Sequence, residues 1–321
     1  MLLILLILLS FSCKKSFLDE HLQSGYTPQN TLTDSLGFEA NVAGIQFQIR
    51  TQYTSDNDQG LIGAMYLGTD MVINGQTTSG MFPYVNNETM NATDICATFY
   101  WNWSYQVLNN INQVIAAANN PAVINTSAAN KAYVGSEAKF YRAYVYNFLT
   151  TLWGDVPLVT APVTTVKVDF VRTSVDSVNA RIVKDLTDAI GVLPTAGSVR
   201  KEGRPSKGMC QQLLAEVYLR MNKPDLAQAQ CQAVIGSGVY SLIKARYGVK
   251  TSVPGDYYND MFLIGNQRRG QGNTEAIWIE EQDLNTPGGT TSNSANPSTD
   301  QHRQWNQTKT TSYPTRTRLR T

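Results

Sequence analysis

Few side chains in this sequence have the type and spacing that catalysis or metal binding requires. The chain contains only 2 histidines, His21 and His302, one near each end. A His-based metal centre or a Ser-His-Asp triad therefore has no candidate in the middle of the chain. Glu280 and Glu281 could suggest paired acids for glycoside cleavage, but adjacent residues on a strand face opposite ways. We expect a protein that is not an enzyme and that needs no metal or cofactor.

Cysteine chemistry is limited to four positions. Cys96, Cys210 and Cys231 form an odd set without a C-x-x-C motif, which argues against structural zinc and a dense disulfide framework. Cys210 and Cys231 could form a disulfide across a helical hairpin if the protein is exported. The interpretation that the sequence favours is that both are small buried apolar residues. Cys13 has a different setting, between an apolar run and a charged one.

The N-terminal stretch MLLILLILLSFSCKKSFLDE fits an export signal better than a membrane span. Residues 1–12 would form a helix of about 18 Å, whereas a bilayer span needs about 20 apolar residues. Residues 2–9 fit the apolar region of a secretory signal, and Ser10 and Ser12 fit its small-residue exit. An N-terminal core strand or helix is the remaining alternative.

A small residue followed by Cys13 resembles the signal of a bacterial lipoprotein. The resemblance implies cleavage before Cys13, a diacylglycerol on its thiol and an acyl chain on the new amine. Each buried methylene contributes about 0.8 kcal/mol, and stable anchoring requires more than one chain. Such motifs usually carry Leu three positions before the Cys, where this chain has Ser10. We therefore expect a signal peptide at 1–12 and a lipidated tether at 13–28.

The composition suits an exported binding protein rather than a nucleic-acid-binding protein. The 321 residues are 42% hydrophobic and 16% charged, with a net charge of +1. This length allows one large domain or two smaller ones with ample core. The balanced charge offers no strong field for nucleic acid or an anionic membrane, and the abundant Asn, Gln, Ser and Thr agree with a neutral polar ligand.

Helical periodicity dominates the middle of the chain. It predicts helices at 30–51, 95–119, 128–152 and 174–193. Asp94 is the expected cap of the second helix. The apolar positions of the first helix are Leu36, Phe38, Val42, Ile45, Phe47 and Ile49, and those of the second are Phe99, Trp103, Val107, Ile111, Val114 and Ile115.

Residues 206–238 match the tetratricopeptide pattern of helix, turn and helix. Asn222-Lys223-Pro224 would form the turn, and Ala215 and Ala227 would let the two helices approach closely. The matching positions are Leu214, Ala215, Tyr218, Ala227, Cys231 and Val234, whereas Gln211 stands where the pattern has Trp. Together with the earlier helices, this unit predicts a mainly α, tetratricopeptide-like helical-repeat scaffold.

Outside the helices, the sequence predicts long irregular loops and one strand. Residues 52–93 lack helical period, and loops of this length are usually functional or disordered. Residues 273–280 alternate apolar and polar side chains, which is typical of a strand. Residues 284–321 form a low-complexity tail that we expect to be disordered.

Five motifs follow one another in order from Cys13 to about Glu281. They are CKKSFLD at 13–19, WNWSYQVLNNIN at 101–112, EAKFYRAY at 137–144 with WGDVPL at 153–158, Arg172 with 174–194, and GRPSK at 203–207. Their order and spacing resemble the SusD/RagB family of nutrient-binding outer-membrane lipoproteins from Bacteroidetes, over most of the chain. Interpreted without this resemblance, the same residues predict helix faces and a turn. Glu137 and Arg142, five apart, would lie on different faces and would not pair.

The resemblance implies a SusD-like helical domain at 29–283 with long irregular loops and four tetratricopeptide-like helix pairs. It also implies a lipid anchor in the outer membrane, exposure at the cell surface and a SusC-like, TonB-dependent transporter as partner. The nutrient would be an oligosaccharide. Family members usually continue well past 321 residues, whereas this chain ends in Thr and Arg repeats. We therefore expect a C-terminally truncated or frame-shifted product.

Glycan binding needs a flat aromatic surface beside fixed hydrogen-bonding groups. Residues 70–94 offer Asp70, Asn74, Gln76, Phe82, Tyr84, Asn86 and Asn87. Tyr84 is the first stacking candidate and Trp101, offset from the buried stripe, is the second; either could instead cover the core. Tyr257 and Tyr258 are a further choice.

Three other functions remain open at this stage. The chain could be a tetratricopeptide-type lipoprotein that binds only proteins, or a relative that binds peptides. A secreted glycan hydrolase is the third, and for it the sequence offers no defensible acid pair.

Overall fold

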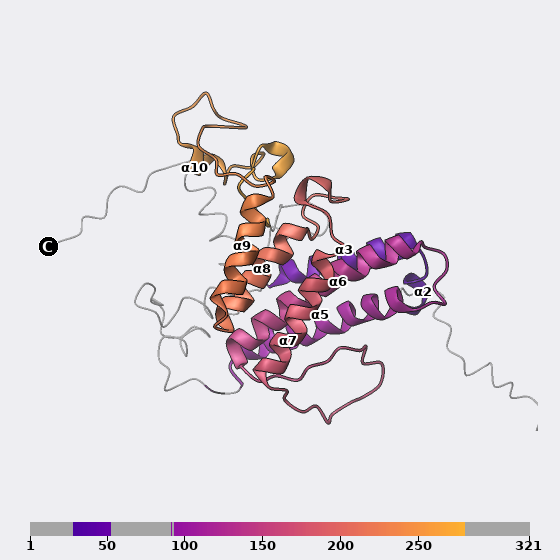
Figure 1. Cartoon of the computed structure of the whole chain (residues 1–321). Coiled ribbons are helices and arrows are strands. Elements are labelled where there is room, and N and C mark those ends of the chain that lie inside the picture. Colours follow the sequence, from indigo (N-terminus) through magenta and orange to yellow (C-terminus); the bar gives the residue numbers. More distant parts are fainter. Residues whose placement is uncertain (1–27, 53–90, 92, 280–321) are drawn as a thin grey trace, which may run out of the picture.

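Helices make up the regular structure of this protein. The computed structural model describes residues 28–52, 91 and 93–279 of the 321. Within those ranges there is no strand, only isolated β-bridges from Asp34 to Asn125 and from Val156 to Thr173. Figure 1 shows the long helices lying side by side, with the later helices following at one end. The prediction of a mainly α fold is confirmed.

The N-terminal helix is interrupted where the sequence predicted one continuous helix. Helix α2 spans Pro28–Thr31 and α3 spans Ser35–Thr51. The Asp34 carboxylate caps α3 by accepting a hydrogen bond from the Gly37 N–H at 2.8 Å. Gly37 also lets the chain turn tightly, since a Cβ there would lie 1.5 Å from the Thr31 carbonyl oxygen. Of the predicted apolar face, Phe38, Val42, Ile45 and Ile49 are buried, whereas Leu36 and Phe47 are exposed.

The two longest helices agree with the sequence prediction. Helix α5 spans Ile95–Asn119 and starts at its predicted cap, Asp94, whose carboxylate accepts from two backbone N–H groups. Helix α6 spans Ala128–Trp153 and ends at Gly154, whose φ of +67° favours glycine. The two helices pack against each other along their lengths (Figure 1). Of the predicted stripe on α5, Trp103, Val107, Ile111, Val114 and Ile115 are buried and Phe99 is half-buried.

The remaining helices stack in chain order. Helix α7 spans Val175–Ile190, α8 spans Lys207–Arg220 and α9 spans Pro224–Gly236. Each packs against the helix before it, which is the arrangement of a helical repeat. Ala215 and Ala227 are each only 2% exposed, as close approach of α8 and α9 requires. The tetratricopeptide-like prediction for 206–238 is therefore confirmed.

The C-terminal part of the described chain contains little helix and no strand. Its short elements are η6 at Ala196–Ser198, α10 at Tyr257–Asp260 and η7 at Arg269–Gln271. The strand predicted at 273–280 was wrong over 273–279, the part that the structure describes. The neighbours Ile277 and Trp278 both pack against the core, and no second strand lies beside them in the described ranges. The alternating pattern there reflects a half-buried segment rather than a sheet.

No disulfide links the cysteines of the described ranges. Cys96 and Cys210 are buried and Cys231 is exposed, so the possible Cys210–Cys231 disulfide is absent. Burial raises the pKa of the Cys210 thiol far above its usual value. Cys210 therefore acts as a small apolar residue of the core. Among the helices described, none combines the length and the apolar character needed to cross a bilayer.

Candidate functional site

An extended segment at residues 157–163, just after α6, is held by polar side chains of α5 and α6. Tyr105 donates its hydroxyl to the Pro157 carbonyl at 3.0 Å, and Asn109 accepts from the Val163 N–H at 2.8 Å. The Tyr146 hydroxyl bonds both backbone groups of Val159, accepting from its N–H at 2.6 Å and donating to its carbonyl at 2.9 Å. These bonds replace the secondary structure that the segment lacks.

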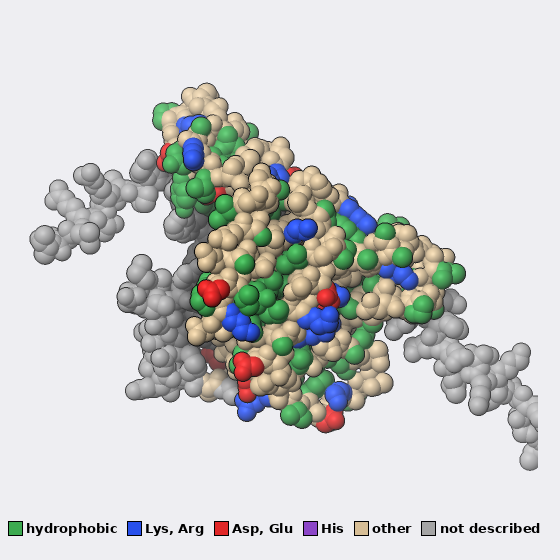
Figure 2. Space-filling model, in the orientation of Figure 1, with side chains coloured by type: hydrophobic (Ala, Val, Ile, Leu, Met, Phe, Trp, Pro, Cys, Tyr) green, Lys and Arg blue, Asp and Glu red, His purple; other side chains and the backbone are tan. Residues whose placement is uncertain are grey.

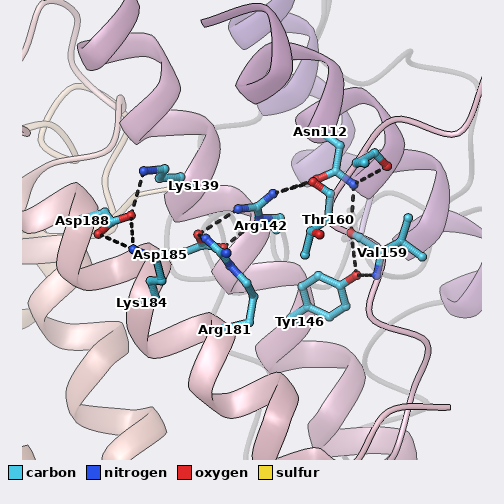
Figure 3. A network of polar contacts seen from close by, with 11 residues as sticks. Asn112, Lys139, Arg142, Tyr146, Val159, Thr160, Arg181, Lys184, Asp185 and Asp188 are labelled. Atoms are coloured by element: carbon cyan, nitrogen blue, oxygen red, sulfur yellow. Dashed lines mark hydrogen bonds and ion pairs between the residues drawn. The ribbon is translucent and has the colours of Figure 1, made fainter. Parts of the chain in front are cut away.

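A buried ion pair lies beside this segment (Figure 3). The Arg142 guanidinium on α6 binds both carboxylate oxygens of Asp185 on α7, at 2.7 and 2.9 Å. Arg142 also donates to Asn112 Oδ1 at 3.0 Å and to the Thr160 carbonyl at 3.3 Å. Asn112 in turn donates to the Val159 carbonyl at 2.9 Å. One connected set of bonds therefore joins α5, α6, α7 and the 157–163 segment.

The outer edge of the same network faces solvent. Arg181 forms a second ion pair with Asp185, and Lys139 and Lys184 both bind Asp188, at 2.8 and 3.2 Å. Partial burial opposes ionisation of Asp188, but the bonds from the two ammonium groups outweigh it and lower its pKa. The two lysine pairs with Asp188 are partly exposed and contribute about 0–1 kcal/mol each, whereas Arg181 pairs with the fully buried Asp185. The buried Arg142–Asp185 pair is the energetically sensitive part.

A second buried ion pair uses Glu137, five residues before Arg142 on α6. Glu137 accepts two hydrogen bonds from Arg204, at 2.8 and 2.7 Å, and Glu39 on α3 lies 3.2 Å from the same guanidinium. Burial raises the pKa of the Glu137 carboxyl, and the bonds from Arg204 oppose that effect. As expected, Glu137 and Arg142 do not pair with each other. Each joins α6 to a different neighbour.

Trp101 lies in an aromatic cluster at the edge of the core. Its ring centroid is 5.0 Å from that of Tyr105 and 5.4 Å from that of Trp153. All three rings are half-buried, so the cluster covers the core and still reaches the surface. Burial raises the pKa of the Tyr105 hydroxyl far above its usual value, so this group stays protonated as a donor. The position of Trp101 permits sugar contact, while its packing is that of a core-edge residue.

The other residues predicted from the sequence to bind ligand or lipid fall outside the described ranges. These are Cys13, Asp70, Asn74 and Tyr84; Glu280 and Glu281, rejected above as a catalytic pair, also lie outside those ranges. Tyr257 and Tyr258 are described, and both are exposed at α10, where Tyr258 packs edge-on against Phe262. They do not approach the Trp101 cluster in any contact of the described chain, so the structure does not join these two aromatic groups into one site.

A groove of about 410 Å³ lies between α3, the loop before α8 and residues 268–279. Its polar lining includes Gln46, Arg50, Glu202, Arg204 and Arg269. Trp278 forms part of its wall and packs edge-on against Phe140 and Tyr144, with centroids 5.3 and 5.0 Å apart. This volume falls in the range of small-molecule sites, about 300–1,000 Å³. The groove therefore offers an aromatic wall beside several hydrogen-bond donors.

Reasoning from the sequence missed the partners in both buried pairs and missed Trp278. Asp185 follows Ile182 by three residues and so falls on the buried stripe of α7, where an acid is unexpected. That position was a usable signal, because a charge on a buried stripe requires a partner. Trp278 gave no such signal, since the period-two pattern around it predicted a strand. In the described ranges no group of acids, cysteines or histidines could hold a metal ion.

The stacked helices and the long irregular connections define a helical-repeat scaffold of the kind that presents a binding surface. A family model described as "Starch-binding associating with outer membrane" matches residues 16–219. This match covers more than half of the chain, and the chain belongs to the SusD-like family, within the SusD/RagB group.

Two curated relatives come from Formosa agariphila. SusD-like protein P2 is 29% identical over 208 residues, covering 62% of this chain and 40% of the relative. SusD-like protein P25 is 23% identical over 282 residues, covering 86% of this chain and 50% of the relative. The chain thus spans about half the length of the curated relatives that it matches.

Solved structures confirm the fold. A laminarin-binding SusD-like protein aligns with a TM-score of 0.59 and 23% identity, over 70% of this chain and 47% of that one. A SusD homolog from Bacteroides thetaiotaomicron aligns with a TM-score of 0.62 and 18% identity, over 84% of this chain and 50% of that one. At these identities the likeness establishes the scaffold alone.

Proposed function

We propose that this chain is a cell-surface lipoprotein that binds an oligosaccharide and delivers it to a SusC-like, TonB-dependent transporter. The observation that carries the proposal is membership of a family described as starch-binding and associated with the outer membrane. The solved relative that binds laminarin adds a second case of glycan binding on this scaffold. The half-buried Trp101 cluster supplies an aromatic surface, and Tyr84, Asp70 and Asn74 are the further ligand-binding residues proposed from the sequence.

Binding would be non-catalytic. Glycoside cleavage requires two carboxyl groups on opposite sides of the bond, about 5–9.5 Å apart. The buried acids Asp185 and Glu137 face arginines rather than a cavity. Both carboxylates are therefore engaged in ion pairs that hold the helices together. The scaffold would therefore hold the glycan for transfer rather than cut it.

Isothermal titration calorimetry with the full chain in detergent tests glycan binding. Laminari-, malto- and acidic oligosaccharides, with a set of peptides beside them, cover the expected ligands and the peptide-binding alternative. Glycan binding supports the proposal, and Trp101→Ala should weaken it. Binding to the transporter without binding to any glycan would favour the alternative, a protein-binding scaffold.

The anchor is tested by Cys13→Ala. We expect the variant to lose metabolic labelling by palmitate and to move from the membrane fraction to the soluble fraction, because its acyl chains are the proposed attachment. Cys231→Ala is the matched control, since Cys231 is an exposed cysteine on α9, far along the chain from the proposed signal. A Cys13→Ala protein that stays in the membrane fraction would rule out the lipid anchor.

A further inference from the structure

The arginines that line the groove beside Trp278 differ in whether their charge is neutralised. Arg204 has two carboxylate partners, Glu137 and Glu39. Arg50 and Arg269 have no carboxylate partner in the part of the chain that the structure describes. The groove therefore contains positive charge that the fold itself does not compensate.

Arg50 lies in the last turn of α3, where the helix dipole favours a cation. Its guanidinium is 5.9 Å from the Phe47 ring. Among the described residues its Nε is buried and has no hydrogen-bond partner. A buried donor without an acceptor is unfavourable, so the contacts of the described fold do not explain why this group is kept here.

Arg269, which also lines the groove, has the same two features, a nearby aromatic ring and a buried Nε without a partner in the described part of the chain. Its guanidinium lies 5.0 Å from the Tyr240 ring centroid and bonds the Val239 carbonyl. Its Nε is also buried without a partner. The Nε1 of Trp278, on the groove wall, is a third buried donor without an acceptor. Three donors that lack acceptors thus belong to residues lining one groove.

The acid in the groove does not remove this surplus. Glu202 accepts a hydrogen bond from the Gly270 N–H at 2.6 Å and forms no ion pair among the described residues, and its single negative charge cannot offset both Arg50 and Arg269. Elsewhere on the molecule, charges of both signs are scattered over the face shown in Figure 2, and the whole chain has a net charge of only +1. The attraction for an anion is therefore local to the groove rather than a property of the surface.

We propose that this groove binds the oxyanion of an acidic sugar, either a uronate carboxylate or a sulfate ester, through Arg50 and Arg269. A guanidinium binds such groups with two parallel N–H bonds, which are stronger than bonds between neutral groups. The Trp278 indole beside them suits a sugar ring, which packs on aromatic surfaces and accepts hydrogen bonds through its hydroxyls. The sugar part of this inference rests on the proposed glycan capture, whereas the oxyanion part rests on the groove alone.

The test is calorimetry on the full chain in detergent with four probes. They are a uronate oligosaccharide, a sulfated oligosaccharide, a neutral laminari-oligosaccharide and sodium sulfate. We expect at least one acidic oligosaccharide to bind tenfold or more tightly than the neutral one. Arg50→Gln and Arg269→Gln should each lower that affinity about tenfold, while Arg172→Gln, an exposed arginine outside the groove, should leave it unchanged.

The outcomes separate the two proposals. Equal affinity for neutral and acidic sugars would overturn the oxyanion site and leave glycan capture standing. Acidic sugars that bind normally to both glutamine variants would overturn the assignment to this groove. Sulfate binding that depends on Arg50, without binding of any oligosaccharide, would support the oxyanion site and overturn glycan capture. Urea unfolding of each variant shows whether lost binding reflects lost folding.

Discussion

Two arginines of this molecule, Arg142 and Arg50, show opposite uses of the same side chain. Arg142 is 2% exposed and shares a bidentate ion pair with Asp185, with further bonds to Asn112 and the 157–163 segment. Arg50 is half-buried in the wall of a groove, with its Nε unpartnered. Arg142 therefore links helices, whereas the guanidinium of Arg50 is the group that we propose binds an external ligand.

This difference shows how structural and ligand-binding charges can be told apart. A buried charge costs several kcal/mol unless a partner of opposite sign compensates it. In the Arg142 network the partner is internal, so removal of either member leaves an unpaired charge in the core. In the groove the partner would be external, so removal of the arginine should affect binding and leave folding almost unchanged. The predictions below measure this contrast.

The largest effect is expected from Asp185→Ala. The substitution leaves the Arg142 guanidinium buried without its carboxylate, which should lower the free energy of unfolding by about 3–5 kcal/mol. Arg181, which also binds Asp185, is partly exposed and can turn to solvent. Urea denaturation followed by circular dichroism measures the change.

Asp169→Ala is the control for that experiment, because Asp169 forms an exposed pair with Lys167. It should leave the urea midpoint almost unchanged, because solvent screens an exposed pair. The double variant Arg142→Met with Asp185→Leu should recover much of the loss, since apolar side chains can replace a buried ion pair. A loss below about 1 kcal/mol in Asp185→Ala would show that the pair is not the sensitive part of the core.

A smaller effect is expected from Tyr146→Phe. Removal of the hydroxyl leaves the Val159 N–H without its acceptor, while the Val159 carbonyl keeps its bond from Asn112. One buried donor without a partner should cost about 1–3 kcal/mol. The measurement is the urea midpoint together with protease cleavage in the 157–163 segment, which should become faster. Unchanged cleavage would mean that the other bonds hold the segment by themselves.

Tyr146 should also give stability a specific dependence on alkaline pH. Burial raises the pKa of its hydroxyl to about 12, whereas an unfolded tyrosine has a pKa of about 10. Its contribution is therefore fully present below pH 10 and is lost as the pH rises from about 10 to 12. The wild type should lose more stability than Tyr146→Phe between pH 9 and pH 11. Parallel curves for the two proteins would contradict the shifted pKa.

The local parts of the structure were predictable from the sequence. Asp94 at the start of α5 and the Asn222 turn between α8 and α9 follow from capping and turn preferences among neighbouring residues. The cap of α3 by Asp34 was the same kind of signal, but we did not predict it because it lies inside a periodic apolar pattern. Family motifs added the order of the helices.

The long-range parts were not predictable. Glu137 was expected to avoid Arg142, but nothing in one sequence identified Arg204, 67 residues away, as its partner. The same limit applies to Asp185, 43 residues from Arg142. The groove required three separate segments to meet, and its Trp278 lay in a pattern that predicted a strand. Pairing across the fold depends on the helix packing, which periodicity alone does not supply.

The smallest effect on stability is expected from Arg50→Gln. This result most directly distinguishes a ligand-binding arginine from a structural one. The substitution removes a guanidinium whose Nε has no partner among the described residues, and it loses a long contact with the Phe47 ring and a small favourable interaction with the end of α3. The free energy of unfolding should change by no more than about 0.5 kcal/mol, whereas Arg142→Gln in the same assay should cost several kcal/mol because Asp185 is left buried. If Arg50→Gln instead lowers the free energy of unfolding by more than about 1.5 kcal/mol, the Arg50 guanidinium stabilises the fold as that of Arg142 does. That result would contradict the proposal that Arg50 is kept to bind an anion. A stable Arg50→Gln protein that no longer binds an acidic sugar would show that this charge serves the ligand.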